Sequence, residues 1–360
     1  MRKLRVAIVG AGLIGMRHAD AVIRHPQATL VALADSNAQS LSRGLSALGD
    51  VRGYTDYKRM LEELELDVLH NCTPNFLHHA VSEAALSRGL HVYGEKPLAE
   101  TVSEGEALVS LAKAKKVKNA VNFNYRGNIC VQEMRNRLKT SSGRVFVIHG
   151  SYLQDWLSRE TDYNWRLETK GPRSLADIGS HWLDLAQFIY GKRIVSVNAS
   201  LFTSWQKRLN GDKPIDISSD DGASLSLRFE DGLLANAIIS QVSGGYKNHI
   251  ALSVDCENYS MRWQQQAADR LVIGRRDGGE ETLYADSAWP SAQGKRSSLP
   301  AGHSQAWADA LSNTISDFYE MILSDTSSPN VATFEDGLNI MKLAEACLAS
   351  GRDGTWHSVE

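Results

Sequence analysis

The sequence is short of cysteine, of long apolar runs and of any excess of one charge. Its 360 residues include four cysteines and no C-x-x-C pair, so a disulfide scaffold is not expected. No apolar run approaches the roughly 20 residues that a membrane-spanning helix needs. The net charge of −3 comes from interspersed acids and bases, without the basic stripe typical of nucleic-acid binding. Neither a membrane nor a nucleic acid is therefore an expected partner.

Cysteine placement and the start of the chain indicate the compartment. The cysteines, Cys72, Cys130, Cys256 and Cys347, are scattered, and two of them lie in apolar segments, which suits a reducing environment. Met1-Arg2-Lys3 enters the first apolar run at once and leaves no room for a cleaved signal peptide. We expect a cytoplasmic protein whose length fits two domains, each large enough to bury its own core.

A glycine-rich loop follows the first apolar run. Leu4 to Val9 predicts a buried parallel strand, which leads into Gly10-Ala11-Gly12-Leu13-Ile14-Gly15 and a helical pattern that ends at Arg24. In a dinucleotide site Gly10 would make the tight turn, Gly12 would admit the pyrophosphate, and Gly15 would let helix and strand pack closely. The order strand, loop, helix therefore predicts dinucleotide binding, with a plain glycine turn as the alternative.

An acidic residue ends the second apolar run. Leu30 to Ala34 predicts a strand, and Asp35 follows it, 20 residues after Gly15, where such folds hold the adenosine ribose. A carboxylate there accepts hydrogen bonds from the 2′-hydroxyl and repels a 2′-phosphate. The sequence therefore predicts NAD, with NADP less favoured, although Ser36 and Arg43 lie close behind and can help to hold a phosphate in enzymes of dual specificity.

Strand and helix patterns alternate up to Phe123. Helices are expected over 55–64 and 76–88, strands over 67–71, 91–93 and 120–123, and a capping box at Ser103 and Glu106 opens another helix. The alternation predicts an α/β Rossmann-type domain, a doubly wound parallel sheet, over residues 1–123. Because ligand-binding loops lie at the carboxyl ends of such strands, one rim should carry Thr73-Pro74-Asn75, Glu95-Lys96-Pro97 and residues 122–126.

The second half of the chain changes to short alternating strands. Strands are expected over 143–153, 223–229, 233–240, 249–254, 259–263 and 271–274, and helices over 174–190, 304–323 and 333–350. Strands joined by hairpins form an antiparallel sheet, so residues 124–360 should form an α+β domain whose large sheet has helices on one face. The bare face of that sheet would be a natural dimer surface.

One of these helices carries a histidine between two carboxylates. Asp177, His181 and Asp184 are spaced to share one helical face. A histidine with a carboxylate one turn away can be held in one tautomer and take the proton of a substrate hydroxyl. The structural alternative is that Asp177 caps the helix, His181 is partly buried and Asp184 is solvated. Lys96 also has two interpretations, a surface lysine or a group that stabilises charge on a substrate oxygen.

Other polar residues give weaker signals. His70, His78 and His79 have no acidic or cysteine partner at metal-binding spacing, and adjacent histidines point apart on a helix, so no metal site is expected. Trp165 and Arg166 suit either a sugar ring or a packed aromatic residue beside a surface arginine.

Several motifs occur in a fixed order over nearly the whole chain. They are the loop 10–15, Asp35, Asn71-Cys72-Thr73-Pro74-Asn75, Glu95-Lys96-Pro97 and Asp177-x-x-x-His181-x-x-Asp184. Together they resemble the glucose-fructose oxidoreductase and inositol 2-dehydrogenase family (Gfo/Idh/MocA). The resemblance implies a Rossmann domain, then a domain with a large, mostly antiparallel sheet, and a homodimer or homotetramer formed through that sheet. It also implies that Lys96, Asp177 and His181 are the catalytic lysine, aspartate and histidine.

The resemblance also implies which residues contact the cofactor and which contact the substrate. Cofactor contacts are expected from Gly10, Gly12, Leu13, Ile14, Gly15, Asp35, Ser36, Thr73, Pro74, Asn75, His78, Glu95, Lys96 and Asn124, and substrate contacts from Tyr125, Arg126, Trp165, Arg166, Asp184 and His303. Residues 240–248 and 301–307 are similar to bacterial sugar dehydrogenases. Two departures from the family pattern, Gly127-Asn128 and Gly171-Pro172-Arg173-Ser174, flank the substrate site, and Arg173 leaves an acidic sugar open.

The predicted function is NAD-dependent oxidation of a secondary hydroxyl of a sugar, sugar derivative or cyclitol by hydride transfer to nicotinamide. In this prediction His181 takes the hydroxyl proton, Asp177 orients it and Lys96 stabilises the oxygen. Two alternatives stay open. One is an enzyme with tightly bound NAD that uses transient oxidation for glycosidic cleavage or epimerisation. The other is a non-catalytic NAD-sensing regulatory protein of the same fold, against which the presence of Lys96 and His181 argues.

Overall fold

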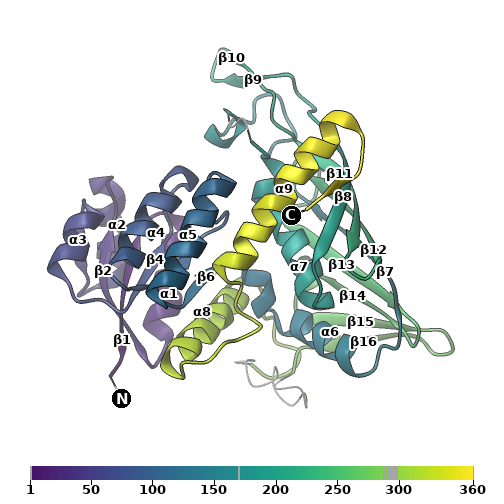
Figure 1. Ribbon diagram of the computed structural model, residues 1–360, viewed down its shortest axis with the longest axis horizontal. Helices are drawn as coiled ribbons and strands as arrows, with labels where there is room; N and C mark the ends of the chain where they lie inside the picture. The colour runs from purple at the N-terminus through teal and green to yellow at the C-terminus, as the bar shows by residue number, and fades with distance from the viewer. Residues whose placement is uncertain (1, 169–170, 287–288, 290–298, 360) are drawn as a thin grey trace. The chain divides into compact units, whose positions relative to one another are not determined.

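The computed structural model describes residues 2–168, 171–286, 289 and 299–359, and the chain divides into two compact units (Figure 1). Unit 1 comprises residues 1–127 and 308–339, and unit 2 comprises residues 128–307 and 340–360. A single boundary after Phe123 would assign residues 308–339 to the second domain. The structure instead places them in unit 1, because helix α8 (Trp307–Leu323) brings Thr314 and Tyr319 into hydrogen bonds with side chains of the parallel sheet.

Unit 1 is built on a six-stranded parallel sheet. The strand order is β3-β2-β1-β4-β5-β6, which is the doubly wound order of dinucleotide-binding folds, so the predicted fold class is confirmed for this part. The strands are β1 (Leu4–Val9), β2 (Ala28–Ala34), β3 (Arg52–Tyr54), β4 (Val68–Asn71), β5 (His91–Gly94) and β6 (Asn119–Val121). The helices are α1 (Leu13–Arg24), α2 (Ala38–Leu48), α3 (Tyr57–Glu63), η1 (Asn75–Leu77), α4 (His78–Ser87), α5 (Val102–Lys115) and η2 (Asn124–Gly127), besides α8. Nearly every residue of β1 and β4 is buried, as expected for strands covered on both faces.

The start of α5 differs from the sequence prediction. The capping box lies at Thr101 and Glu104, two residues before the predicted pair Ser103 and Glu106. The Thr101 hydroxyl accepts from the Glu104 backbone N–H at 3.2 Å, and the Glu104 carboxylate accepts from the N–H groups of Thr101 and Glu100, each at 3.1 Å. Both pairs have capping-box spacing, so spacing alone did not separate them.

Unit 2 is built on a nine-stranded sheet in the order β16-β15-β14-β13-β7-β12-β11-β8-β17. Its strands are β7 (Val145–Leu153), β8 (Ile194–Phe202), β11 (Gly222–Phe229), β12 (Leu234–Ser240), β13 (His249–Cys256), β14 (Ser260–Gln264), β15 (Arg270–Arg275), β16 (Gly279–Tyr284) and β17 (His357–Ser358). A separate hairpin consists of β9 (Lys207–Asn210) and β10 (Lys213–Asp216). Only β12 and β7 pair in parallel among the described strands of this sheet, which confirms the predicted mostly antiparallel arrangement.

Helices cover one face of the large sheet (Figure 1). α6 (Ile129–Thr140) packs on β14 and β15, and α7 (Ser180–Tyr190) packs on β7 and β13. The other helical segments of this unit are η3 (Trp165–Glu168), η4 (Leu175–Gly179), η5 (Gln265–Ala267) and most of α9 (Phe334–Asp353). On β12, Ala235 and Ala237 face the covered side, whereas Leu234 and Ile238 are exposed on the opposite side. Within the described residues, no helix is both long and apolar enough to cross a bilayer.

Candidate active site

The glycine loop of unit 1 connects β1 to α1. Gly10 has φ of +105°, and a Cβ there would lie 2.3 Å from the carbonyl oxygen of Cys72; a Cβ at Gly15 would lie 1.8 Å from that of Gly10. Packing within the protein thus explains both of these glycines. A Cβ at Gly12 would meet nothing within 4 Å, so packing within the described part of the chain does not require glycine there. Close approach of a pyrophosphate, as in dinucleotide-binding loops, would require it.

The N-terminus of α1 is suited to an anion. Its N-cap is Gly12, which has no side chain to accept from the first N–H groups, and its first turn has no acidic residue. These unused donors and the helix dipole favour a phosphate. The neighbouring side chains Leu13 and Ser36 are exposed. The loop geometry therefore fits the diphosphate of a dinucleotide.

Asp35 ends β2 and is held by two backbone donors. Its Oδ2 accepts from the N–H of Ala11 and its Oδ1 from the N–H of Asn37, each at 2.8 Å. Asn37 in turn caps α2 by accepting from Gln39 and Ser40. The carboxylate is thus fixed beside the glycine loop, with lone pairs left over for ribose hydroxyls.

The loops after β4 and β5 are joined by His78. Its ring nitrogens lie 2.6 Å from the carbonyl oxygen of Pro97 and 2.9 Å from that of Thr73. Burial lowers the pKa of His78, while the two carbonyl hydrogen bonds oppose that shift. Both ring nitrogens therefore face protein atoms. His78 connects the segment Thr73-Pro74-Asn75 to the Lys96-Pro97 segment, where the Lys96–Pro97 peptide is cis.

Glu95, which directly precedes Lys96, ends a buried chain of polar groups. Its Oε1 lies 3.1 Å from Nε2 of His18 and 2.5 Å from Nδ2 of Asn122. Nδ1 of His18 lies 2.9 Å from Nδ1 of His70, whose Nε2 lies 2.8 Å from the Tyr319 hydroxyl. Burial raises the pKa of the Glu95 carboxyl, but the contacts with His18 and Asn122 outweigh it and bring the pKa to about 2.

Asn124, Tyr125 and Arg126 follow β6 in η2, and all three are buried. Within the described residues, Nδ2 of Asn124 has no hydrogen-bond acceptor. A buried donor without an acceptor costs free energy, so a ligand oxygen is a reasonable partner for it. The Arg126 guanidinium, which was predicted to contact substrate, forms an ion pair with Asp336 at 3.3 Å within unit 1.

In unit 2 the helix that carries Asp177 and His181 begins with a π-helical turn. η4 runs directly into α7, so the predicted helix over 174–190 is present but its first turn is wider than a regular α-helix. Short π-helical turns are frequent at functional sites. The Asp220 carboxylate, from a distant segment, accepts from the backbone N–H groups of Arg173, Ser174 and Leu175 at 2.8, 2.9 and 3.2 Å. Asp220, and not Asp177, therefore accepts from the free backbone N–H groups at the start of this helix.

Asp177 instead accepts a hydrogen bond from the side chain of Gln241, with 2.8 Å between Nε2 and Oδ2. His181 is 8% exposed, and its ring centroid lies 6.3 Å from that of Tyr152 on β7. The Tyr152 hydroxyl donates to Oδ1 of Asn248 at 2.6 Å. Asp184 is 2% exposed, so the interpretation of it as a solvated residue is wrong.

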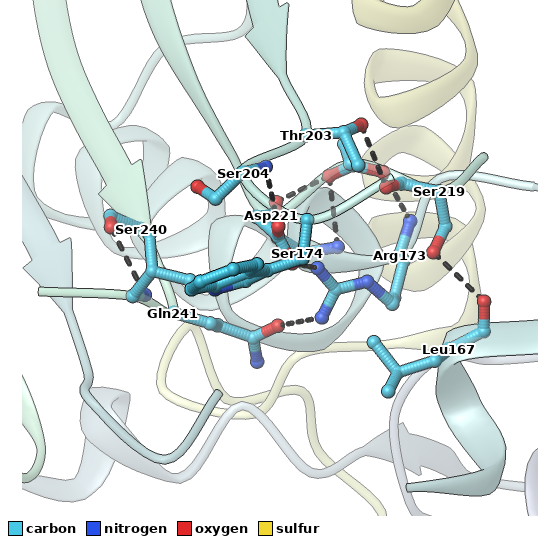
Figure 2. A network of polar contacts seen from close by, with 12 residues as sticks. Leu167, Arg173, Ser174, Thr203, Ser204, Ser219, Asp221, Ser240 and Gln241 are labelled. Carbon is cyan, nitrogen blue, oxygen red and sulfur yellow. Dashed lines mark hydrogen bonds and ion pairs between the residues drawn. The ribbon is translucent and has the colours of Figure 1, made fainter. Parts of the chain in front are cut away.

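Arg173 takes part in a buried network of charges (Figure 2). Its guanidinium donates to Oε1 of Gln241 at 2.6 Å and pairs with Asp221, which also pairs with the buried Arg208 at 3.0 Å. Arg173 is 3% exposed, and the negative charges of Asp221 and Asp220 act on its guanidinium. The suggestion that Arg173 favours an acidic sugar is therefore not supported, because its guanidinium is buried and binds Gln241 and Asp221 within the protein.

The remaining predicted substrate residues are less well defined. The side chain of Trp165 lies outside the described residues. Arg166 is half-buried in η3, with its backbone N–H bonded to Oδ1 of Asn164 at 3.1 Å. His303 is exposed in a turn before α8, and its Nδ1 lies 3.1 Å from the carbonyl oxygen of Pro300. No group of three or more His, Cys, Asp or Glu residues in the described part of the chain could hold a metal ion.

The sequence prediction missed Gln241, Asp220 and the His18–His70 pair. Gln241 and Asp220 reach the helical segment that carries Asp177 and His181 from segments more than 40 residues away, and no local pattern marks them. A signal for His18 was present, because a histidine on the apolar side of α1 must find a buried partner.

Comparison with known proteins agrees with this architecture. Residues 4–123 match the model of an oxidoreductase family with an NAD-binding Rossmann fold, and residues 131–262 match the GFO/IDH/MocA C-terminal domain. Levoglucosan dehydrogenase of Pseudarthrobacter phenanthrenivorans is 26% identical over 100% of this chain and 99% of its own. D-glucoside 3-dehydrogenase of Escherichia coli is 30% identical over 55% of this chain and 58% of its own. A structure of levoglucosan dehydrogenase in complex with NADH and L-sorbose matches with a TM-score of 0.93 and 25% identity, over 100% of both chains.

Proposed function

The chain belongs to the Gfo/Idh/MocA family of NAD-binding oxidoreductases, and we propose that it oxidises a secondary hydroxyl of a pyranose, a pyranoside or a cyclitol. The observation that carries this proposal is similarity over the whole chain to a levoglucosan dehydrogenase, including a structure that holds both NADH and a sugar. Similarity over both domains supports shared chemistry better than a shared Rossmann domain would, because that domain serves many unrelated reactions.

NAD, when bound, supplies the acceptor for the hydride. The open space at Gly12, the unused N–H groups of α1 and the unsatisfied amide of Asn124 fit such a dinucleotide. The fixed carboxylate of Asp35 would accept from the adenosine ribose and would repel a 2′-phosphate. We therefore propose NAD in preference to NADP.

Three residues of this chain would act on the proton and the oxygen of the reacting hydroxyl, and a fourth would bind the substrate ring. His181 would take the proton of the reacting hydroxyl as general base, and Asp177 would orient the imidazole and stabilise its protonated form. Lys96 would donate to the reacting oxygen and stabilise the negative charge that develops there. Asp184 would accept from a ring hydroxyl, which favours a polyhydroxylated ring over an apolar alcohol.

Other features of the chain support a proposal for its assembly and its compartment. Leu234 and Ile238 are exposed beside serine and asparagine side chains on the face of the large sheet opposite α6 and α7. We propose that a second copy of the chain covers this face in a homodimer or homotetramer. All four cysteines are free, which fits the cytoplasm.

The test is nicotinamide reduction by the purified protein with sugars, glycosides, sugar acids and inositols, with and without added NAD. Net NADH formation that requires added NAD supports the proposal. Turnover by dialysed protein without added NAD would favour transient oxidation with a tightly held cofactor. Binding of NAD without turnover of any substrate would favour the regulatory alternative.

A further inference from the structure

We propose that Gln241 is a positioning residue, which holds the Asp177 carboxylate in one orientation for the proton transfer at His181. This inference rests on the proposed function of Asp177 and His181. Gln241 follows β12, its side chain is 0% exposed, and its Nε2 donates to Oδ2 of Asp177 at 2.8 Å. Gln241 thus fixes one oxygen of the carboxylate from the side of the sheet.

The chemistry of its neighbours fixes which way the Gln241 amide points. An arginine guanidinium can only donate, so the Gln241 atom that lies 2.6 Å from Arg173 must be the oxygen. The amide nitrogen must then face Asp177, whose carboxylate accepts. The backbone of Gln241 is held as well, because its N–H donates to the Asp221 carbonyl at 3.0 Å and its carbonyl accepts from Leu157 at 3.1 Å. Neither end of this side chain has an alternative arrangement.

The anchor behind Gln241 is an ion-pair network. Arg173 binds Gln241 with one arm of its guanidinium and pairs with Asp221 through the other (Figure 2). Asp221 is held in turn by Arg208 at 3.0 Å and by the backbone N–H of Ser204 at 2.7 Å. All three charged side chains are at most 3% exposed. Because breaking a buried pair leaves an uncompensated charge, this arrangement is costly to distort, and it gives Gln241 a rigid support.

A neutral amide between Arg173 and Asp177 has a specific chemical consequence. A direct arginine–aspartate pair would fix the carboxylate and would also match its negative charge. Gln241 holds one oxygen of the carboxylate without placing a positive charge in direct contact with it, and the Arg173 charge behind Gln241 acts on Asp177 only through space. We expect the Asp177 carboxylate, held in this orientation, to stabilise a protonated His181.

Two substitutions test this inference. Gln241→Met keeps a similar volume but removes the donor, and should lower kcat by about 10- to 100-fold, the usual effect of losing an orienting partner, with the KM for NAD unchanged. Gln241→Glu replaces the donor with a second carboxylate. The contact between the introduced carboxylate and Asp177 could persist only while the two share a proton, so kcat should fall as pH rises, and this fall should begin at a lower pH than any alkaline fall of the parent enzyme.

The control is Gln187→Met, the same change at another buried glutamine of unit 2. The Gln187 carboxamide oxygen accepts from the backbone N–H of Ile194 at 2.9 Å, at the far end of α7. This variant should lose stability to a similar extent as Gln241→Met but keep its kcat. An equal loss of kcat in both variants would overturn the proposal, because it would reduce Gln241 to a packing role.

A substrate-free measurement separates this inference from the proposed function. NMR titration of the His181 imidazole should show a lower pKa in Gln241→Met than in the parent, because a misplaced Asp177 carboxylate stabilises the imidazolium less well. Gln187→Met should leave that pKa unchanged. This result would support the role of Gln241 even if every tested sugar failed as a substrate. An unchanged His181 pKa in Gln241→Met would overturn it even if the protein were an active sugar dehydrogenase.

Discussion

Nε2 of His18 lies 3.1 Å from Oε1 of Glu95 inside unit 1. An ionised carboxylate only accepts, so Nε2 of His18 carries a proton and donates to Glu95. Behind this contact, Nδ1 of His18 lies 2.9 Å from Nδ1 of His70, and burial holds the pKa of His70 well below its ordinary value. The donors of His18 and Asn122 stabilise the ionised form of Glu95, the residue that precedes the proposed catalytic Lys96, and hold it in place.

Glu95 should make stability depend on pH in the acidic range. Its pKa in the folded protein is about 2, below the ordinary value of 4.5, so the unfolded chain binds this proton more readily. The stabilisation is fully present above about pH 4.5 and is lost as pH falls toward 2; the shift corresponds to roughly 3 kcal/mol. Urea unfolding at a series of pH values should show this loss in the parent but not in Glu95→Gln. The exposed control Glu83→Gln should follow the parent, and an identical pH dependence in Glu95→Gln would refute the account.

Lys96→Ala and His181→Ala should each reduce turnover while NADH binding stays nearly intact. Loss of a charge stabiliser or a general base typically costs roughly 100- to 10,000-fold. Steady-state kinetics would measure the loss of turnover, and fluorescence titration with NADH would measure binding of the cofactor. Lys58→Ala, at an exposed site on α3, and His357→Ala, in β17, serve as controls and should keep the parent rate. Turnover within a few-fold of the parent would return Lys96 and His181 to purely structural roles.

Asp35→Asn should narrow the preference for NADH over NADPH. The substitution removes the negative charge that would repel a 2′-phosphate, and its amide oxygen can still accept from one of the two backbone N–H groups that hold Asp35. We expect NADH to bind more tightly than NADPH in the parent and the difference to shrink by about tenfold in the variant, a change near 1.4 kcal/mol. Equal affinities in the parent protein would contradict the assignment of Asp35.

Ile238→Lys should disrupt assembly through the large sheet. Ile238 is 47% exposed on the face opposite α6 and α7, and a lysine there would be buried without a partner in an interface between copies. Light scattering coupled to size-exclusion chromatography should give a dimer or larger for the parent and a smaller species for the variant. Ser226→Lys on the neighbouring strand β11 would test how far that interface extends. A monomeric parent protein would contradict the proposed assembly through the large sheet.

Most of the fold could be predicted because its signals are local. The glycine loop, the strand patterns and Asp35 each depend on a few consecutive residues, and strands β1, β2 and β4 were found within two residues of their observed limits. Helix α6 was missed, although Asn128 caps it, because Gly127-Asn128 was interpreted only as a departure from a family motif.

The parts of the site that could not be predicted depend on long-range contacts. Asp220 satisfies the start of the π-helical turn and Gln241 holds Asp177, and both come from later segments of the chain. Arg173 was interpreted as part of a departure from the family pattern beside the substrate site, whereas its guanidinium is buried against Asp221. Partners of this kind follow from the packing of unit 2, which no spacing rule in the sequence encodes.

The most direct test of the central claim compares sugars with simple alcohols as hydride donors. Purified protein would be given NAD and either levoglucosan, methyl glucosides and inositols or aliphatic secondary alcohols of similar size, and nicotinamide absorbance would be followed. The account predicts NADH formation with at least one pyranose, pyranoside or cyclitol and little with the aliphatic alcohols. Equal oxidation of the aliphatic alcohols, or no oxidation of any ring polyol, would contradict it.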